Sequence, residues 1–148
     1  MLRFVTLLFT LTLSPGLVAD NHVEHMVSKD SAALNLPFSD AVRVDNIIFM
    51  SGQLGVNTND FTLVEGGIDA ETHQIFANMK TLLEGRGGKL DDIFKCTVMM
   101  ADISEWPAFN KIYVTYFPGK KPARSAFGAN GLALGAAVEM ECWAYASP

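Results

Sequence analysis

The sequence DAETHQIFANMKTLLEGRGG, residues 69–88, and the sequence IFKCTVMMA, residues 93–101, decide the fold class. Apolar side chains in the first stretch recur every three or four residues, which predicts one buried face of an α-helix. Asp69 is suited to cap the start of this helix, and the glycines at 85, 87 and 88 are suited to end it. The second stretch is mostly apolar and β-branched, as in a buried strand. A helix that leads into a buried strand indicates an α/β domain.

Upstream of this unit, the sequence predicts a β-hairpin. Apolar and polar residues alternate from Ala41 to Val44, Asp45-Asn46 offers a turn, and residues 47–50 resume as a strand. Residues 54–67 are rich in Gly, Asn, Thr and Asp, which is typical of a loop. Residues 20–36 are polar and are expected to form a short, irregular leader.

Downstream, the sequence predicts a second helix and two further strands. Ser104 is suited to cap the helix and Pro107 to lie in its first turn. Strands are expected from Arg124 and from residues 136–146. The predicted order is β-β-α-β-α-β-β, with two helices on one face of a mixed sheet. The helix-free face would be bare, and such faces usually meet another subunit. The second predicted helix, which Ser104 is suited to cap, also carries an apolar stripe that is most simply explained as core packing: Trp106, Phe109, Tyr113, Tyr116 and Phe117.

The N-terminus has the features of an export signal. A basic start is followed by a short apolar stretch, residues 4–13, and by small residues that end at Ala19. This stretch is too short to span a bilayer comfortably, so residues 1–19 are predicted to be a signal peptide. An uncleaved anchor is the alternative. The prediction makes the protein periplasmic or secreted, not bound to a membrane once the signal is removed, with its domain in residues 37–148.

Export bears on the two cysteines of the chain, Cys96 and Cys142. Both lie in segments that are predicted to be strands, and a disulfide is permitted in an oxidising compartment. The sequence does not tell whether these strands are neighbours. Two buried free thiols are therefore preferred over a bridge.

Composition narrows the function. The chain has 148 residues, about half of them hydrophobic, which suits one domain with a proper core. Its net charge of −5 argues against a nucleic-acid partner. The sequence has no glycine-rich phosphate loop, no Cys-x-x-Cys and no His-Glu-x-x-His. Neither a metal site nor a hydrolytic triad is expected.

Five short blocks occur in a fixed order along the domain: Pro37-Phe38-Ser39, Ser51-Gly52-Gln53, Asn110-x-x-Tyr113, Pro122-Ala123-Arg124-Ser125 and Val138-Glu139-Met140-Glu141. With these blocks the chain resembles the RidA (YjgF) family of enamine/imine deaminases. The resemblance implies a chorismate-mutase-like fold and a homotrimer with sites between its subunits. It also implies the hydrolysis of small reactive enamines and 2-imino acids to 2-keto acids and ammonia, without a cofactor.

The resemblance also assigns roles to residues. Arg124 matches the family arginine that grips the substrate carboxylate, and Glu139 matches the glutamate that positions water. A planar guanidinium holds a carboxylate with two hydrogen bonds, and a carboxylate in a partly dry cleft can act as a general base. The resemblance implies further substrate-binding positions: Phe38, Ser51, Gly52, Asn110 and Ala126.

Two of these positions depart from the family pattern. Phe38 stands where the family often has tyrosine, and Ala126 stands where it frequently has cysteine. Phe38 favours one alternative to an imine deaminase, a non-catalytic protein that binds small carboxylates, whereas Glu139 favours the enzyme. The resemblance implies a further alternative, an endoribonuclease or chaperone-like activity. The acidic net charge and the absence of a His-based acid/base pair count against RNA cleavage.

Overall fold

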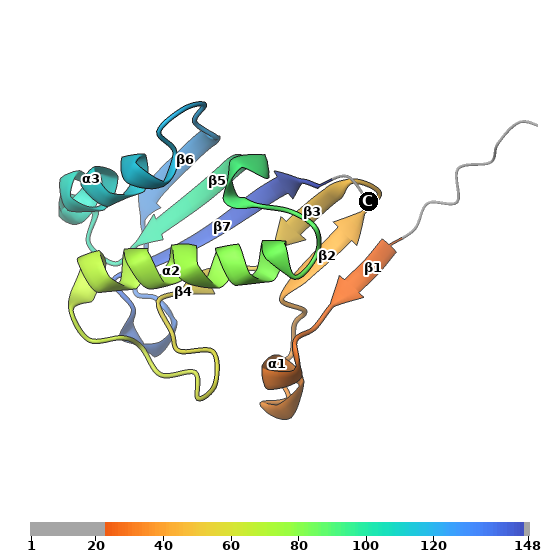
Figure 1. Cartoon of the computed structure of the whole chain (residues 1–148). Helices are drawn as coiled ribbons and strands as arrows, with labels where there is room; N and C mark the ends of the chain where they lie inside the picture. Colours follow the sequence, from red (N-terminus) through yellow and green to blue (C-terminus); the bar gives the residue numbers. More distant parts are fainter. Residues whose placement is uncertain (1–22, 147–148) are drawn as a thin grey trace, which may run out of the picture.

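The computed structural model describes residues 23–146, so the predicted signal peptide lies outside the described residues. Its centre is a seven-stranded sheet with the order β1-β2-β3-β7-β5-β6, in which β4 also pairs with β7 (Figure 1). The strands are β1 (Val23–Met26), β2 (Ala41–Val44), β3 (Ile47–Met50), β4 (Gln53–Leu54), β5 (Ile93–Met100), β6 (Ala123–Gly128) and β7 (Val138–Tyr145). The α-helices are α1 (Lys29–Ala33), α2 (Gly67–Glu84) and α3 (Trp106–Tyr116).

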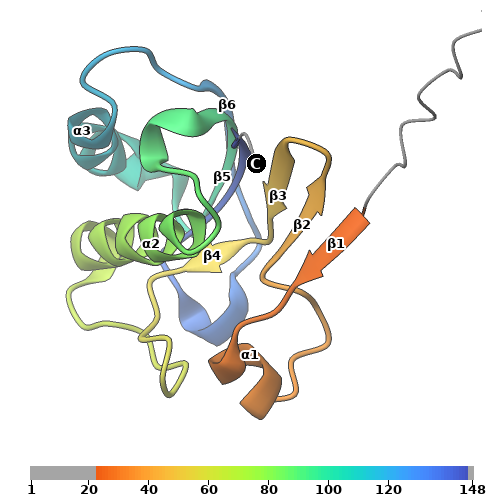
Figure 2. The same cartoon turned by 45° about the vertical axis from the view of Figure 1, so that its right-hand side comes forward.

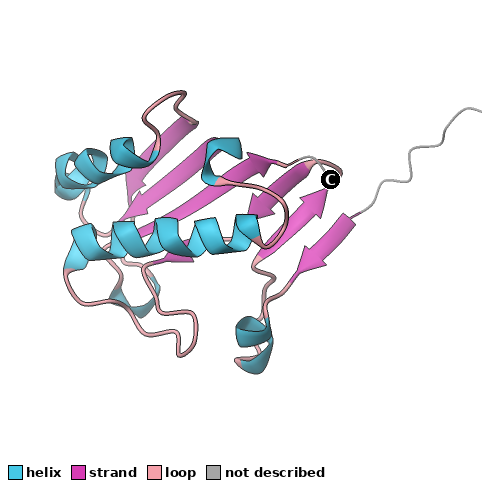
Figure 3. Ribbon diagram, viewed as in Figure 1, coloured by secondary structure: helices cyan, strands magenta, loops and turns pink. Residues whose placement is uncertain are grey.

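The predicted fold class is confirmed. β5 and β6 are parallel while β5 and β7 are antiparallel, so the sheet is mixed. Figures 1 and 2 show α2 and α3 side by side on the same face of the sheet, and Phe76 of α2 stacks on Tyr116 of α3. The strands from β2 onward and these two helices follow the predicted order, to which β1, α1 and β4 are added. Figure 3 distinguishes the helices from the strands of the sheet that they cover.

Helix α2 is held by the apolar face that its spacing predicts. Ile75, Met79 and Leu83 are completely buried against the sheet. The predicted stop at Gly85 is confirmed, but the predicted cap at Asp69 is wrong. The helix begins earlier, at Gly67, because Gly66 has a φ of 120° that only glycine adopts readily.

Helix α3 also begins differently from the prediction. The side chain of Asp102, not that of Ser104, accepts the capping hydrogen bond, and it caps a single 3₁₀ turn, Ile103–Glu105. The α-helix follows directly from Trp106, with Pro107 in its first turn as predicted. None of the helices within residues 23–146 is long and apolar enough to cross a membrane.

The expectation that residues 23–36 are irregular is wrong. Strand β1 pairs with β2, and Met26 lies opposite Ala41, where both side chains are buried. Ser28 then caps α1 by accepting a hydrogen bond from the backbone N–H of Ser31. Only one of the four β1 side chains is buried, so the segment carries almost no alternating signal.

The two cysteines form a disulfide, which corrects the preference for free thiols. Cys96 of β5 and Cys142 of β7 lie directly opposite each other across an antiparallel pair. Both are completely buried in the core on the helix-covered face of the sheet. Strands 46 residues apart in sequence are neighbours here, a relation that no local pattern reveals.

The opposite face of the sheet lacks a helix within the described residues. Along β7, the side chains that alternate with the buried ones are Glu139, Glu141, Trp143 and Tyr145. Trp143 packs edge-on against Phe49 of β3 and remains 36% exposed. This bare face, as we call it, therefore has a carboxylate end and an aromatic end.

Candidate functional site

The first group of candidate residues surrounds the bend between β3 and β4. The backbone N–H of Ser51 donates to the Asp40 carbonyl over 2.9 Å, and its hydroxyl donates to the Ser39 carbonyl over 2.7 Å. These bonds hold the segment that carries Phe38 beside the bend. A Cβ on Gly52 would collide with the carboxylate of Glu139 where it now lies, so the glycine lets this carboxylate approach the bend closely.

The Glu139 carboxylate is half-buried, and within residues 23–146 no group donates a hydrogen bond to it. Burial raises its pKa, and the neighbouring charge of Glu141 raises that pKa further. A carboxylate with a raised pKa and unused lone pairs is suited to accept a proton from water. Glu139 is thus a candidate general base.

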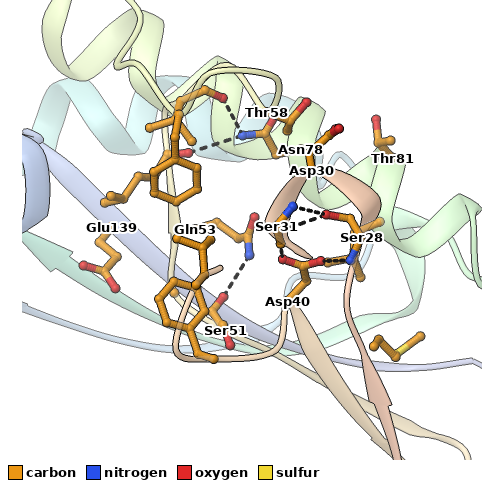
Figure 4. A pocket seen from close by; sticks show the side chains of 18 of the residues that line it. Ser28, Asp30, Ser31, Asp40, Ser51, Gln53, Thr58, Asn78, Thr81 and Glu139 are labelled. Atoms are coloured by element: carbon orange, nitrogen blue, oxygen red, sulfur yellow. Dashed lines mark hydrogen bonds between the residues drawn. The ribbon is translucent and has the colours of Figure 1, made fainter. Parts of the chain in front are cut away.

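A cavity of about 550 Å³ runs along β4, and we call it the β4 cavity (Figure 4). Its lining includes Phe38, Ser51, Gly52 and Glu139. Its floor includes Asn78 and Thr81 of α2, and its walls come from α1 and from the loops on either side of β4 and before β7. Sequence reasoning missed most of its apolar lining, which comes from separate loops and elements: Leu36, Leu54, Val56, Phe61, Leu82 and Leu134.

The second group of candidate residues lies beneath α3. The guanidinium of Arg124 is 4.5 Å from the ring centroid of Trp106 and 4.3 Å from that of Tyr113. Its Nη2 donates to Asn110 Oδ1 over 2.6 Å. Trp106, Asn110 and Tyr113 lie at positions i, i+4 and i+7 of α3, so they share a face of this helix. The aromatic stripe that suggested core packing therefore also holds the candidate arginine.

Arg124 retains an unused donor. Its Nη1 is buried and has no hydrogen-bond partner within residues 23–146. Burial lowers the pKa of this guanidinium, while Tyr113 raises it. A buried guanidinium nitrogen without an acceptor is costly, and an anionic group would satisfy it.

One subunit does not bring the two groups together. Arg124 lies opposite Cys96 in the register of β5 and β6, so its side chain points to the helix-covered face, and Ala126 shares that direction. Glu139 lies opposite Met99 and points to the other face. Strand β5 also separates β6 from β7. The arginine and the glutamate thus belong to two half-sites on opposite faces of the sheet.

Within residues 23–146, no three His, Cys, Asp or Glu side chains gather in an arrangement that could hold a metal ion.

Comparison with known proteins agrees with this fold. Residues 29–146 match the model of the family described as endoribonuclease L-PSP. The mouse protein 2-iminobutanoate/2-iminopropanoate deaminase is 38% identical over 82% of this chain and 89% of its own length. Reactive Intermediate Deaminase A of Arabidopsis thaliana is 34% identical over 80% of this chain, which spans 64% of that relative.

A solved structure shows the same fold. The yeast protein YEO7 has a TM-score of 0.77 and 36% identity, over 86% of this chain and all of that chain. The fold is that of a mixed α/β protein, and its candidate residues lie on both faces of one sheet. The chain belongs to the RidA (YjgF) family.

Proposed function

We propose that the protein hydrolyses small 2-imino acids to 2-keto acids and ammonia, at a site that two subunits complete. The single observation that carries the proposal is the division of Arg124 and Glu139 between opposite faces. Relatives named as imino-acid deaminases, at 34% and 38% identity, support the reaction class.

The residues present suit each step. Arg124 Nη1 binds the substrate carboxylate, and Asn110 with the aromatic rings of α3 fixes the direction of the guanidinium. Glu139 takes a proton from water as the water oxygen bonds to the imine carbon, and the imine nitrogen gains a proton. The product of this addition is a carbinolamine, and its carbon–nitrogen bond then breaks. Ammonia leaves with the bonding pair and a proton, the hydroxyl loses its proton, and the keto acid remains.

The assembly that we propose is a homotrimer with three such sites. A subunit whose bare face carries Phe49, Trp143 and Tyr145 has apolar surface to bury. A neighbouring copy seated on that face could bring its Arg124 edge toward Glu139. A heterologous contact of this kind closes into a ring, and the family resemblance gives that ring three members.

Subunit complementation tests this proposal directly. Arg124→Ala and Glu139→Gln are each expected to keep at most a small fraction of wild-type activity as pure proteins. In trimers formed from an equal mixture, sites that combine an intact Arg124 with an intact Glu139 from the neighbouring copy should restore about a quarter of wild-type activity, from random assortment. Activity is followed as the appearance of keto acid from imines made by an amino-acid oxidase. Mixed trimers without activity would contradict a shared site.

Phe38 favours a second candidate function, the binding of small carboxylates without hydrolysis. Its side chain is 49% exposed, lines the β4 cavity and offers no hydroxyl to substrate or water. A binder would hold 2-keto acids yet leave the rate of keto-acid formation unchanged in the same assay. Phe38→Tyr should then create activity, whereas an enzyme that works without the hydroxyl should change by about tenfold or less, the value of one neutral hydrogen bond.

We also propose that the protein is exported. The buried Cys96–Cys142 bridge supports this, because disulfides persist in oxidising compartments and are rare in the cytosol. Fractionation of cells that express the full chain, with the N-terminal residue of the product determined by mass spectrometry, tests it. An unprocessed cytosolic product would contradict it.

A further inference from the structure

The β4 cavity extends well beyond the reacting groups. Figure 4 shows Glu139 at one end and the side chains of Ser28, Ser31 and Asp40 at the other. Its volume of about 550 Å³ is that of a pocket for a whole small molecule. The methyl or ethyl side chain of a three- or four-carbon 2-imino acid would leave most of this volume empty.

Most polar side chains around the cavity, Glu139 excepted, already form hydrogen bonds within the protein itself. The Asp40 carboxylate accepts hydrogen bonds from the Ser31 hydroxyl and from the Ser28 backbone N–H. Asn78 donates to the carbonyls of Leu54 and Val56 over 3.3 and 2.9 Å. These groups hold α1 and β4 in place and have little hydrogen bonding left for a ligand. The surface that remains for a ligand is mainly apolar.

Two apolar residues of the lining adopt a backbone conformation that suits them poorly. Phe61 and Leu134 both have a φ of 59°, in the left-handed region that bulky side chains rarely occupy. They come from different loops, one after β4 and one before β7, and both contribute to the same cavity. Strained residues of this kind concentrate at ligand-binding sites. Leu134 is also 57% exposed, so its strain is not explained by burial in a core.

We propose that the β4 cavity binds the side chain of the 2-imino acid and selects substrates with long or branched apolar side chains, such as those derived from leucine or phenylalanine. This inference rests on the proposed function. With the substrate carboxylate on Arg124 of one copy and the imine carbon beside Glu139 of another, the side chain enters the cavity past Gly52. Leu134, Phe61 and Phe38 are then the residues that determine specificity.

The test compares kcat/KM for imines made from leucine, phenylalanine and alanine. The wild-type protein should prefer the two larger substrates by about tenfold or more, the effect of filling an apolar pocket. Leu134→Ala, which removes apolar contact, and Thr58→Trp, which narrows the cavity, should each lower the ratio of leucine to alanine kcat/KM by about fivefold or more. Both positions are exposed, so neither change disturbs the core.

Leu34→Ala is the matched control, because Leu34 is an exposed leucine (41% exposed) that does not line the cavity. It should leave both rates unchanged. A wild-type protein that prefers the alanine-derived imine, or a ratio that neither variant changes, would overturn the inference while the proposed function stands.

If no imine is hydrolysed faster, the proposed function fails and calorimetry decides the inference separately. Tighter binding of 4-methyl-2-oxopentanoate than of pyruvate, reduced in Leu134→Ala, would uphold the cavity as a side-chain pocket. Equal binding of the two keto acids would overturn it.

Discussion

Glu139 carries a carboxylate whose pKa is raised above the ordinary 4.5, first by burial and then by Glu141. Because only the deprotonated form can take a proton from water, kcat/KM should fall as the pH is lowered through this raised pKa. The fall should begin at a higher pH than an ordinary glutamate would give. Glu141→Gln removes the second cause and keeps an oxygen for the Trp143 indole, so it should move the fall to lower pH.

The pH profile of kcat/KM, measured for both proteins with one imine, checks this prediction. Free imines also hydrolyse in water at rates that depend on pH, so the uncatalysed rate is subtracted at each point. A fall that stays at the same pH in Glu141→Gln would show that another group controls the profile.

We expect that no other cationic side chain can replace Arg124 without a loss of activity. Arg124→Ala should lower kcat/KM by an amount equivalent to about 1.5–3 kcal/mol, the value of a hydrogen bond to a charged group. Arg124→Lys should recover little, because an ammonium cannot bind a carboxylate with two parallel bonds or reproduce the contacts of the planar guanidinium with the rings of Trp106 and Tyr113. Circular dichroism serves to show that both variants keep the fold. Full activity in Arg124→Ala would remove Arg124 from the site.

At this scale the sequence offers candidate residues but does not tell where they lie relative to one another. The short blocks point to Arg124, Glu139, Ser51, Gly52 and Asn110, and the structure groups them as two half-sites. The sequence pattern does place Glu139 and Glu141 on one face, because they are two residues apart in a strand. It cannot relate Arg124 to Glu139, because that depends on the registers of β6 and β7 with β5.

At the scale of elements, the long periodic segments are predicted well and the short ones are missed. α2 and β5 bury many side chains in a regular pattern, so their sequences reveal them. β4 has only two residues, and β1 buries one side chain, so their pairing partners determine them rather than their own composition. β1, α1 and β4 contribute to the walls of the β4 cavity. Because these short elements cannot be predicted from their own sequences, the cavity cannot be predicted either.

The bridge between β5 and β7 is expected to stabilise the protein substantially. A double variant, Cys96→Ala with Cys142→Ala, should lower the free energy of unfolding by about 2–4 kcal/mol, because the bridge restricts the unfolded chain. Urea unfolding without reductant measures this difference. Wild-type protein unfolded with dithiothreitol isolates the bridge from the loss of the sulfur atoms. Equal midpoints for the oxidised and reduced proteins would contradict a stabilising role.

At the scale of the whole molecule, the bare face predicts association. Light scattering on the mature protein should give about three times the monomer mass. Trp143→Asp places a charge among Phe49 and Phe94, at the aromatic end of that face, and should give monomers that keep their secondary structure. Those monomers should hydrolyse no imine, because each holds Arg124 and Glu139 on opposite faces. An active monomer would contradict the shared site.

The division of the two half-sites has a consequence for how the protein behaves when it is scarce. If two subunits complete the site as we propose, a lone chain carries both half-sites but cannot combine them, so turnover per molecule depends on the protein concentration. Upon serial dilution, specific activity should decline as trimers dissociate, and it should return upon reconcentration. If the proposed assembly is correct, a chain is inactive until it has joined other copies, so activity itself reports correct assembly.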